Sequence, residues 1–517
     1  MAEPRDGNRR PGRGAGSQSE RLPDRAHAGE GGSGDGRSAR TAGKTNGPGQ
    51  TGGPDRPGPP GRAIGAREAA LRVLLRVDRE GAYSGLELNR TLASARLSRA
   101  DAALATELVY GTIQRLNTID WVLSSRVKGW PDRIEPHIRA LLRMSYYQLR
   151  WLSRVPPHAV VNEAVNLARK HGHAGVAGLV NGVLRRLLRE GVAPALPGDM
   201  PFAERVALEH SHPRWLVERW CAAYGPEVAV AICRANNEPP RLSARINPLR
   251  TSRDCLLREM REAGLDASAS VLSEAGVAVV RGGNLAATPW FAGGQLTIQD
   301  ESSMLVAAVA DPRPGSTVVD CCAAPGGKAT HLAELMGDRG IVIANDVHAH
   351  KAKLIREQAG RLGLTSIKTV TGDAAGLPER LGPGSADVVL LDAPCSGLGV
   401  IRRKPEIKWN KTARDIAALA DLQASLLDRV QELVRPGGVL VYSTCTIARE
   451  ENENNVRRFL QRHPDFALDP AWPERVLEPL RAAGLLPDPF PGMFQLLPHH
   501  FGTDGFFIAR FRRAERP

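Results

Sequence analysis

The chain has 517 residues, a formal net charge of +13 at pH 7 and hydrophobic side chains at 42% of its positions. This length predicts several domains, and the apolar content is sufficient for their cores. The positive charge favours a polyanionic partner. No apolar run is long enough to span a bilayer, and the N-terminus lacks the apolar segment of a secretory signal. We therefore expect a soluble cytoplasmic protein with no membrane partner.

The seven cysteines have neither the pattern of a disulfide framework nor the spacing of a metal site. No Cys-x-x-Cys pair or Cys/His cluster occurs among them, which argues against zinc. We therefore expect reduced thiols and no bound metal. The cysteines are Cys221, Cys233, Cys255, Cys321, Cys322, Cys395 and Cys445.

Residues 1–62 consist mainly of Gly, Pro, Arg, Ser and Asp, with almost no large apolar side chains. Such a segment cannot bury enough surface to offset its conformational entropy, which predicts a disordered basic tail. Over residues 63–192, apolar side chains recur at helical spacing, as at Ala69, Val73 and Val77, and prolines separate the periodic stretches. This pattern predicts an all-helical domain of five to seven helices.

The arginines of this helical region either form a basic, RNA-binding face or lie singly on solvated helix surfaces, and the sequence leaves both interpretations open. They are Arg139, Arg143, Arg150, Arg154, Arg185, Arg186 and Arg189.

Residues 193–285 mix helical and strand patterns, which predicts a small α+β connector. Helices are expected over 213–224, 226–235 and 251–263, and a strand over 242–247.

Over residues 286–517, short apolar runs alternate with helical stretches, as expected for strands buried on both faces of a parallel sheet. This alternation predicts a doubly wound, Rossmann-like α/β domain. The expected strands cover residues 318–321, 341–345, 367–370, 388–391 and 439–443, and the expected helices cover 328–335, 350–362 and 413–434.

Ligands of doubly wound sheets bind beyond the carboxyl ends of the strands, and unusual residues follow the expected strands here. The Gly-rich turn Asp320–Lys328 lets the backbone approach a ligand and leads into a helix N-terminus. Asp346 ends the second strand, where a carboxylate suits ribose hydroxyls, and Asp373 follows the third, within reach of an adenine amino group. Together these residues predict a cofactor that contains a nucleoside.

Two cysteines follow the remaining strands. Cys395 lies in the segment Asp392–Gly397, and Cys445 lies in the segment Tyr442–Thr446. A single buried cysteine is common in a protein core, but two thiols at neighbouring strand ends indicate thiol chemistry.

The segments Asp320–Lys328, Asp392–Gly397 and Ser443–Thr446 resemble those of the bacterial RNA cytosine-C5 methyltransferases. Segments 291–303 and 502–507 extend this resemblance over residues 200–513. The helical region resembles the RNA-binding antitermination factor NusB, which implies the small-subunit rRNA branch of the family. The resemblance implies S-adenosyl-L-methionine as cofactor and ribosomal RNA of the small subunit as partner, and we expect a monomer. Ala329 stands where the family usually has Thr or Ser.

The resemblance also implies a role for each site residue. Carbon 5 of cytosine is too weak a nucleophile to take a methyl group directly, so a thiolate must first add to carbon 6. By resemblance, Cys445 is that nucleophile, Cys395 assists product release, and Asp392 stabilises charge on the ring. The cofactor-binding residues implied by the family are Cys322, Ala323, Ala324, Pro325, Gly326, Gly327, Lys328, Asp346, Asp373 and Asp392.

Three alternatives stay open. In DNA cytosine methyltransferases the Pro-Cys cysteine is the nucleophile, which would exchange the roles of the two thiols. A tRNA substrate is the second alternative, and a non-catalytic rRNA-binding assembly factor is the third. Separately, Arg402–Trp409 combines basic side chains with an aromatic ring, which favours contact with RNA over a plain solvent loop.

Overall fold

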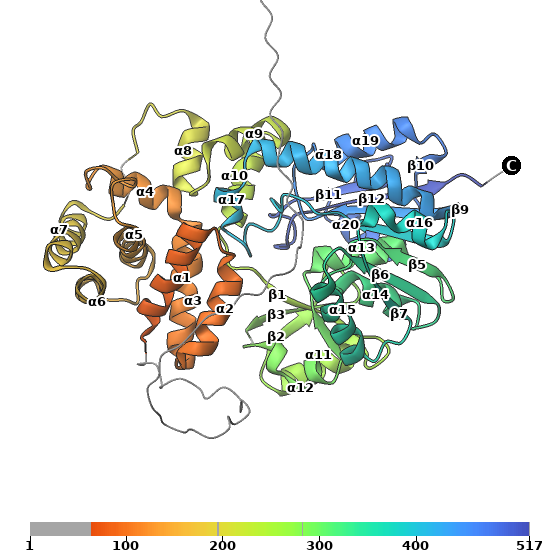
Figure 1. The fold of residues 1–517 in the computed structure, drawn as a ribbon, viewed down its shortest axis with the longest axis horizontal. Helices are drawn as coiled ribbons and strands as arrows, with labels where there is room; N and C mark the ends of the chain where they lie inside the picture. The colour runs from red at the N-terminus through yellow and green to blue at the C-terminus, as the bar shows by residue number, and fades with distance from the viewer. Residues whose placement is uncertain (1–63, 194–195, 282, 516–517) are drawn as a thin grey trace, which may run out of the picture. The chain divides into compact units, whose positions relative to one another are not determined.

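The computed structural model describes residues 64–193, 196–281 and 283–515. Three regions follow one another along these residues: a helical domain, a connector around a small sheet, and a domain with a large mixed sheet (Figure 1). The predicted fold class is confirmed. The tail predicted over residues 1–62 lies outside the described residues. Among the described residues, no helix has the length and apolar character needed to cross a membrane.

The helical domain has seven helices within residues 64–193, in agreement with the prediction of five to seven. Its core is formed by the apolar faces of neighbouring helices, with Val73, Leu108 and Leu142 fully buried. Burial of such faces supplies most of the stability of helices of this length. The helices are α1 (Ala66–Glu80), α2 (Ser84–Ala95), α3 (Arg99–Gln114), α4 (Leu116–Ser124), α5 (Pro136–Trp151), α6 (Pro157–His171) and α7 (Ala174–Glu190).

The connector contains an antiparallel sheet in the order β2-β3-β1-β4. Strand β4 lies beyond residue 285, where the sequence analysis ended the connector, because Ala244 of β1 pairs with Ile298. The elements are α8 (Phe202–Glu209), α9 (Arg214–Tyr224), α10 (Pro226–Ala235), β1 (Leu242–Ile246), α11 (Arg253–Glu262), β2 (Asp266–Ala269), β3 (Gly276–Arg281), η1 (Leu285–Ala287), α12 (Pro289–Ala292) and β4 (Leu296–Ile298).

The large sheet has the order β10-β12-β9-β8-β5-β6-β7, and β11 pairs with β12. The five strands from β9 to β7 are parallel, as predicted, whereas β12 runs antiparallel to β9. The strands are β5 (Thr317–Asp320), β6 (Ile341–Asp346), β7 (Ile367–Thr371), β8 (Ala386–Asp392), β9 (Val434–Thr444), β10 (Phe466–Leu468), β11 (Met493–Leu496) and β12 (Phe506–Arg513).

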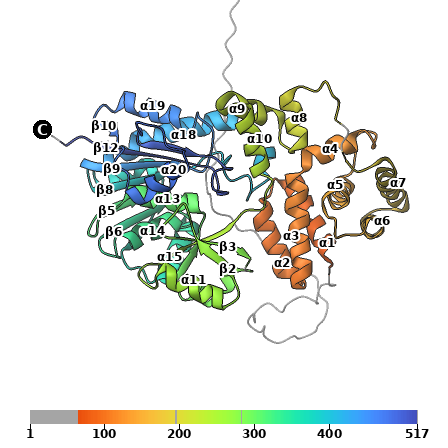
Figure 2. The same ribbon diagram turned by 180° about the vertical axis from the view of Figure 1, so that it is seen from behind.

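Helices cover both faces of this sheet, with α18 and α19 on one side and α14 and α15 on the other (Figures 1 and 2). Fully buried strand residues such as Val318 and Val319 therefore contact different helical layers. The helices are α13 (Glu301–Ala310), α14 (Gly327–Leu335), α15 (Ala349–Leu362), η2 (Ala374–Gly376), α16 (Leu377–Leu381), α17 (Ile407–Asn410), α18 (Ala413–Val430), η3 (Gln431–Leu433), α19 (Glu453–Arg462) and α20 (Glu474–Ala482).

The segment Arg402–Trp409 lies mostly inside the protein, so the interpretation as an RNA-contacting loop was wrong. Lys408 is fully buried, and its Nζ donates to the carbonyls of Gln114 (2.8 Å) and Ser211 (2.7 Å). Trp409 donates from its indole N–H to the carbonyl of Ile113 (2.8 Å). The carbonyls of Ile113 and Gln114 lie at the end of α3, where the last C=O groups lack partners in the following turn, so an indole N–H and a cation satisfy them. The sequence of a basic and aromatic segment does not show whether its donors bind phosphate groups or the carbonyls at a helix end.

Candidate active site

The predicted site residues lie at one edge of the parallel sheet. Asp320, Asp346 and Asp392 are the last residues of β5, β6 and β8, and Cys445 directly follows β9. The chain passes from β5 to β6 on one side and returns through β8 on the other. Such a point of reversal opens a crevice beyond the carboxyl ends of the strands.

The turn between β5 and α14 brings its backbone close to a neighbouring helix. Gly326 has a φ of +108°, and a Cβ there would lie 3.3 Å from the Cα of Ile355. Only glycine adopts this conformation without strain. Helix α14 then begins at Gly327, so backbone N–H groups of its first turn are free for a ligand carboxylate.

Three carboxylates surround this turn. Asp346 accepts the backbone N–H of His348 (3.0 Å), and Asp373 accepts that of Ala375 (3.0 Å), so each has capacity for another donor. Asp320 is fully buried, and neither of its carboxylate oxygens has a hydrogen-bond partner among the described residues. Burial and the nearby Asp392 raise the pKa of Asp320 to about 7. These acceptors fit a cofactor that carries ribose hydroxyls and positive charge.

The two predicted thiols are in contact. The Sγ atoms of Cys395 and Cys445 lie 3.4 Å apart. The hydrogen bond between them lowers the pKa of the Cys445 thiol against the opposing effect of burial, and it raises the pKa of Cys395 well above its ordinary value. Lys328 and Lys404 add positive charge that also lowers the pKa of Cys445. The two pKa shifts and the lysine charges therefore favour Cys445 as the thiolate of the pair and Cys395 as its hydrogen-bond donor.

Asp392 is held in place between the cofactor turn and the thiols. Its carboxylate accepts from the Nζ of Lys328 (2.7 Å) and from the hydroxyl of Ser443 (2.8 Å). Burial alone would lower the pKa of Lys328, but the Asp392 carboxylate outweighs it and raises this pKa. Lys328 is therefore a cation that orients Asp392.

Glu451 joins the loops that carry the two cysteines, and the sequence analysis missed it. Its carboxylate accepts the backbone N–H of Ser396 (2.8 Å), beside Cys395, and the hydroxyl of Thr446 (3.2 Å), beside Cys445. Gln423 of α18 also donates to it (2.9 Å). Glu451 is fully buried. No local pattern marks this residue, since its partners come from separate parts of the chain.

Among the residues that the structure describes, no group of three or more His, Cys, Asp or Glu is arranged to hold a metal ion.

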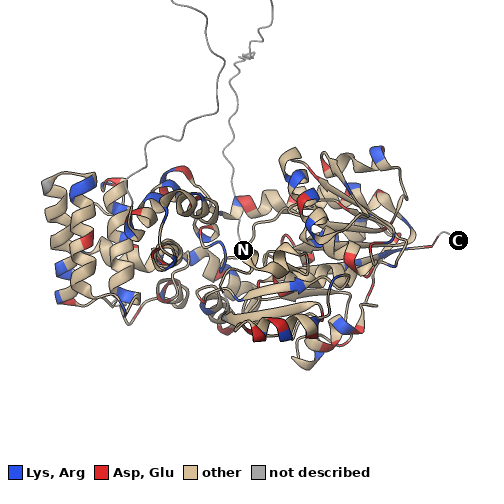
Figure 3. Cartoon of the chain, turned by 90° about the horizontal axis from the view of Figure 1, so that it is seen from below, with Lys and Arg blue, Asp and Glu red and all other residues tan. Residues whose placement is uncertain are grey.

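Apart from this site, a polar groove lies in the helical domain, between α6 and α7. Arg169 and Arg185 line it together with Asn162, Asn166 and Asn181. Of the arginines considered for a basic face, Arg185 faces this groove. Basic and acidic residues are otherwise interspersed along the chain (Figure 3).

Two of the arginines considered for a basic face, in the first half of α5, form ion pairs within the helical domain. Arg143 is buried and pairs with Asp78 and Asp120, and Arg139 pairs with Asp78. A continuous basic face over all seven arginines is therefore not formed.

Fold and site define the class of Rossmann-like methyltransferases. The description "16S rRNA methyltransferase RsmB/F" matches residues 307–512, "NusB family" matches residues 65–189, and an RsmF/B-like ferredoxin-like domain matches residues 212–286. The chain belongs to the RsmB/F family of 16S rRNA methyltransferases.

Similar proteins cover nearly the whole chain. A Bacillus subtilis protein named "Probable ribosomal RNA small subunit methyltransferase B" is 44% identical over 449 residues, which are 86% of this chain and 98% of the relative. A Synechocystis protein of the same name is 38% identical over 87% of this chain and 100% of its own length. The crystal structure of PH0851 is 28% identical, with a TM-score of 0.71, over 88% of this chain and 100% of that one.

Proposed function

We propose that this protein transfers a methyl group from S-adenosyl-L-methionine to carbon 5 of a cytosine in 16S ribosomal RNA, through a covalent cysteine–cytosine adduct. The contact between the thiols of Cys395 and Cys445 carries this proposal, because an amine or hydroxyl acceptor is already nucleophilic and needs no thiol. Relatives named as methyltransferases of small-subunit ribosomal RNA support the substrate. The groove lined by Arg169 and Arg185 is a candidate contact for that RNA.

The Cys445 thiolate is the nucleophile in this proposal. It bonds to carbon 6 of cytosine, and the electron pair of the 5,6 double bond moves to carbon 5. The lowered pKa of Cys445 supports this assignment, since the thiolate is the reactive form. Asp392, oriented by Lys328 and Ser443, accepts a hydrogen bond from the N4 amino group and so holds the ring in position for the attack.

The turn Cys322–Lys328, with Asp346, Asp373 and Asp392, is proposed to hold the cofactor. S-Adenosyl-L-methionine would supply an electrophilic methyl group there. As carbon 5 took this group, the bond between the methyl group and the sulfonium sulfur would break, and the cofactor would leave as the thioether S-adenosyl-L-homocysteine. Carbon 5 then loses its proton to water, and that electron pair restores the 5,6 double bond. The bond between carbon 6 and Cys445 breaks as the thiol of Cys395 donates to the departing sulfur, which its raised pKa supports.

The test is methylation of defined RNAs by the purified chain. Methyl-labelled cofactor is offered with 16S rRNA, 23S rRNA or total tRNA from a strain that lacks this protein, and each product is sequenced after bisulfite treatment. We expect label in 16S rRNA and one newly protected cytosine. Label confined to tRNA would identify the alternative substrate. Bound but unlabelled 16S rRNA would favour a non-catalytic assembly factor.

A further inference from the structure

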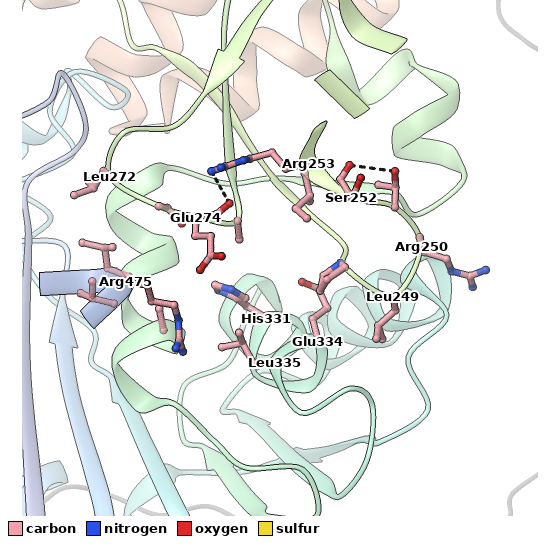
Figure 4. Close-up of a pocket in the computed structure, with 18 of the residues that line it drawn as sticks. Leu249, Arg250, Ser252, Arg253, Leu272, Glu274, His331, Glu334, Leu335 and Arg475 are labelled. Carbon is pink, nitrogen blue, oxygen red and sulfur yellow. Dashed lines mark hydrogen bonds between the residues drawn. The ribbon is translucent and has the colours of Figure 1, made fainter. Parts of the chain in front are cut away.

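A cavity of 720 Å³ lies between the connector and the catalytic domain (Figure 4). Its walls come from the loop between β1 and α11, the loop between β2 and β3, and helices α13, α14 and α20. None of the proposed catalytic or cofactor-binding residues lines it. The cavity is therefore separate from the thiol site, although α14 contributes to both.

His331 on α14 is the unsatisfied polar group of this cavity. Its side chain points into the space between the walls (Figure 4), and the residue is only 3% exposed. The buried Nδ1 has no hydrogen-bond partner among the described residues. Burial, with Arg245 and Arg475 nearby, lowers the pKa of His331 well below its ordinary value. A neutral imidazole keeps one nitrogen as an acceptor, so a ligand with an N–H donor would satisfy it.

Apolar side chains form the walls next to His331. Leu272, Leu305 and Val476 are almost completely buried, and Leu335 and Leu249 continue the surface. Apolar walls with a few polar groups are typical of small-molecule sites, and they suit a flat ring.

The opposite wall suits an anion. Residues Thr251–Asp254 line the cavity and include the first turn of α11, whose backbone N–H groups lack intrahelical partners. Arg250 borders the cavity, but its side chain points away from it (Figure 4) and its guanidinium lies beside Gly363. Arg253 donates to the carbonyl of Glu274 (2.9 Å), which holds it at the rim.

We propose that this cavity binds a nucleotide, with the base between the apolar walls and the phosphate at the start of α11 beside Arg253. A base N–H donates to His331. The Glu274 carboxylate also points into the cavity (Figure 4), which favours a base that carries an amino group. The occupant is an unpaired nucleotide of RNA, so the inference rests on the proposed RNA substrate and adds a second contact to it.

Calorimetric titration of the full chain, with S-adenosylhomocysteine present to fill the cofactor site, tests this assignment. The probes are guanosine 5′-monophosphate and an unstructured RNA hexamer at matched salt. The variant Arg253→Gln should bind the hexamer at least about tenfold more weakly. Arg258→Gln is the matched control, because Arg258 is exposed on the same helix and does not line the cavity. It should bind as the unmodified protein does.

His331→Phe keeps a ring of similar shape and removes the acceptor of the base N–H, so it should weaken binding of guanosine 5′-monophosphate. If Arg253→Gln binds only the hexamer more weakly, the occupant is a nucleotide of an RNA strand. If it binds the mononucleotide more weakly to the same extent, the occupant is a free nucleotide. No saturable binding of either probe, or the same loss in Arg258→Gln, overturns the proposal. These titrations need no methyl transfer, so a failure of the proposed methylation is recognised separately.

Discussion

The sulfur atoms of Cys395 and Cys445 lie 3.4 Å apart although 50 positions separate the two residues in the chain. Strands β8 and β9 are neighbouring parallel strands, with Asp392 opposite Ser443, so the loops that follow them emerge at the same edge. A hydrogen bond then distinguishes two otherwise similar thiols by their pKa values. The asymmetry leads to opposite expectations for the two cysteines.

Cys445→Ala should abolish both turnover and any covalent protein–RNA complex, because it removes the proposed nucleophile. Cys395→Ala should accumulate that complex, because release of the product is impaired, and a slower band on a denaturing gel would reveal it. Cys255→Ala, in α11, is the control and should behave as the unmodified protein. The reverse pattern would assign the nucleophile to Cys395, and an adduct unaffected by either change would exclude covalent catalysis by these thiols.

Glu451→Gln should lower kcat by about 10- to 100-fold with little change in KM for the cofactor, because small displacements of reacting groups are costly. Its carboxylate accepts from Ser396 and Thr446, which flank the two cysteines. Alkylation of Cys445 by iodoacetamide at pH 7 should slow as well, a change that general destabilisation does not produce. Glu450→Gln, at the adjacent and partly exposed position, is the control. Normal kinetics in Glu451→Gln would remove it from a positioning role.

Asp346→Ala should weaken binding of S-adenosylmethionine by about tenfold or more, since it removes the proposed acceptor of the ribose hydroxyls. Calorimetry on the full chain measures this effect. Asp421→Ala, exposed on α18, is the matched control. Undiminished affinity in Asp346→Ala would place the ribose elsewhere.

Arg169→Glu combined with Arg185→Glu should weaken RNA binding by about tenfold or more and leave cofactor affinity unchanged, because both side chains line the groove between α6 and α7. The salt dependence of RNA binding should also become shallower. Charge reversal is preferable to removal of the helical domain, which would uncover Lys408. Equal RNA affinity in the variant and the unmodified protein would show that this groove does not bind the RNA.

Asp320→Asn should stabilise the cofactor-free protein in a pH-dependent way. The pKa of this carboxyl is raised from 3.8 to about 7, so the folded state retains a proton that the unfolded state releases. In the unmodified protein, the resulting loss of folding stability grows from pH 3.8 to about 7 and then levels off, at most at about 4 kcal/mol. The variant avoids this loss. Urea unfolding at pH 4.5 and pH 7.5 should therefore show a larger gain for the variant at the higher pH. A gain independent of pH would contradict the raised pKa.

The order of elements was accessible from the sequence because burial leaves a local pattern. Runs such as 318–321 and 388–391 are apolar because both faces of their strands are covered, and a polar residue marks where each strand ends. The strands β10, β11 and β12 were not predicted. They form the antiparallel part of the sheet beyond β9, and that pairing depends on partners far away in the chain.

Sequence by itself determined the helical, connector and Rossmann-like regions, the Gly-rich turn and the two cysteines, since each rests on residues adjacent in the chain. Tertiary structure alone decided which groups meet. Lys408, a candidate RNA contact in the sequence, is a buried donor to the carbonyl at the end of α3 in the structure. Glu451 lies between the two cysteine loops and accepts hydrogen bonds from both. The physical reason is that periodicity records how deeply a residue is buried. The identity of its neighbour depends on strand order, register and helix packing, which no short segment contains.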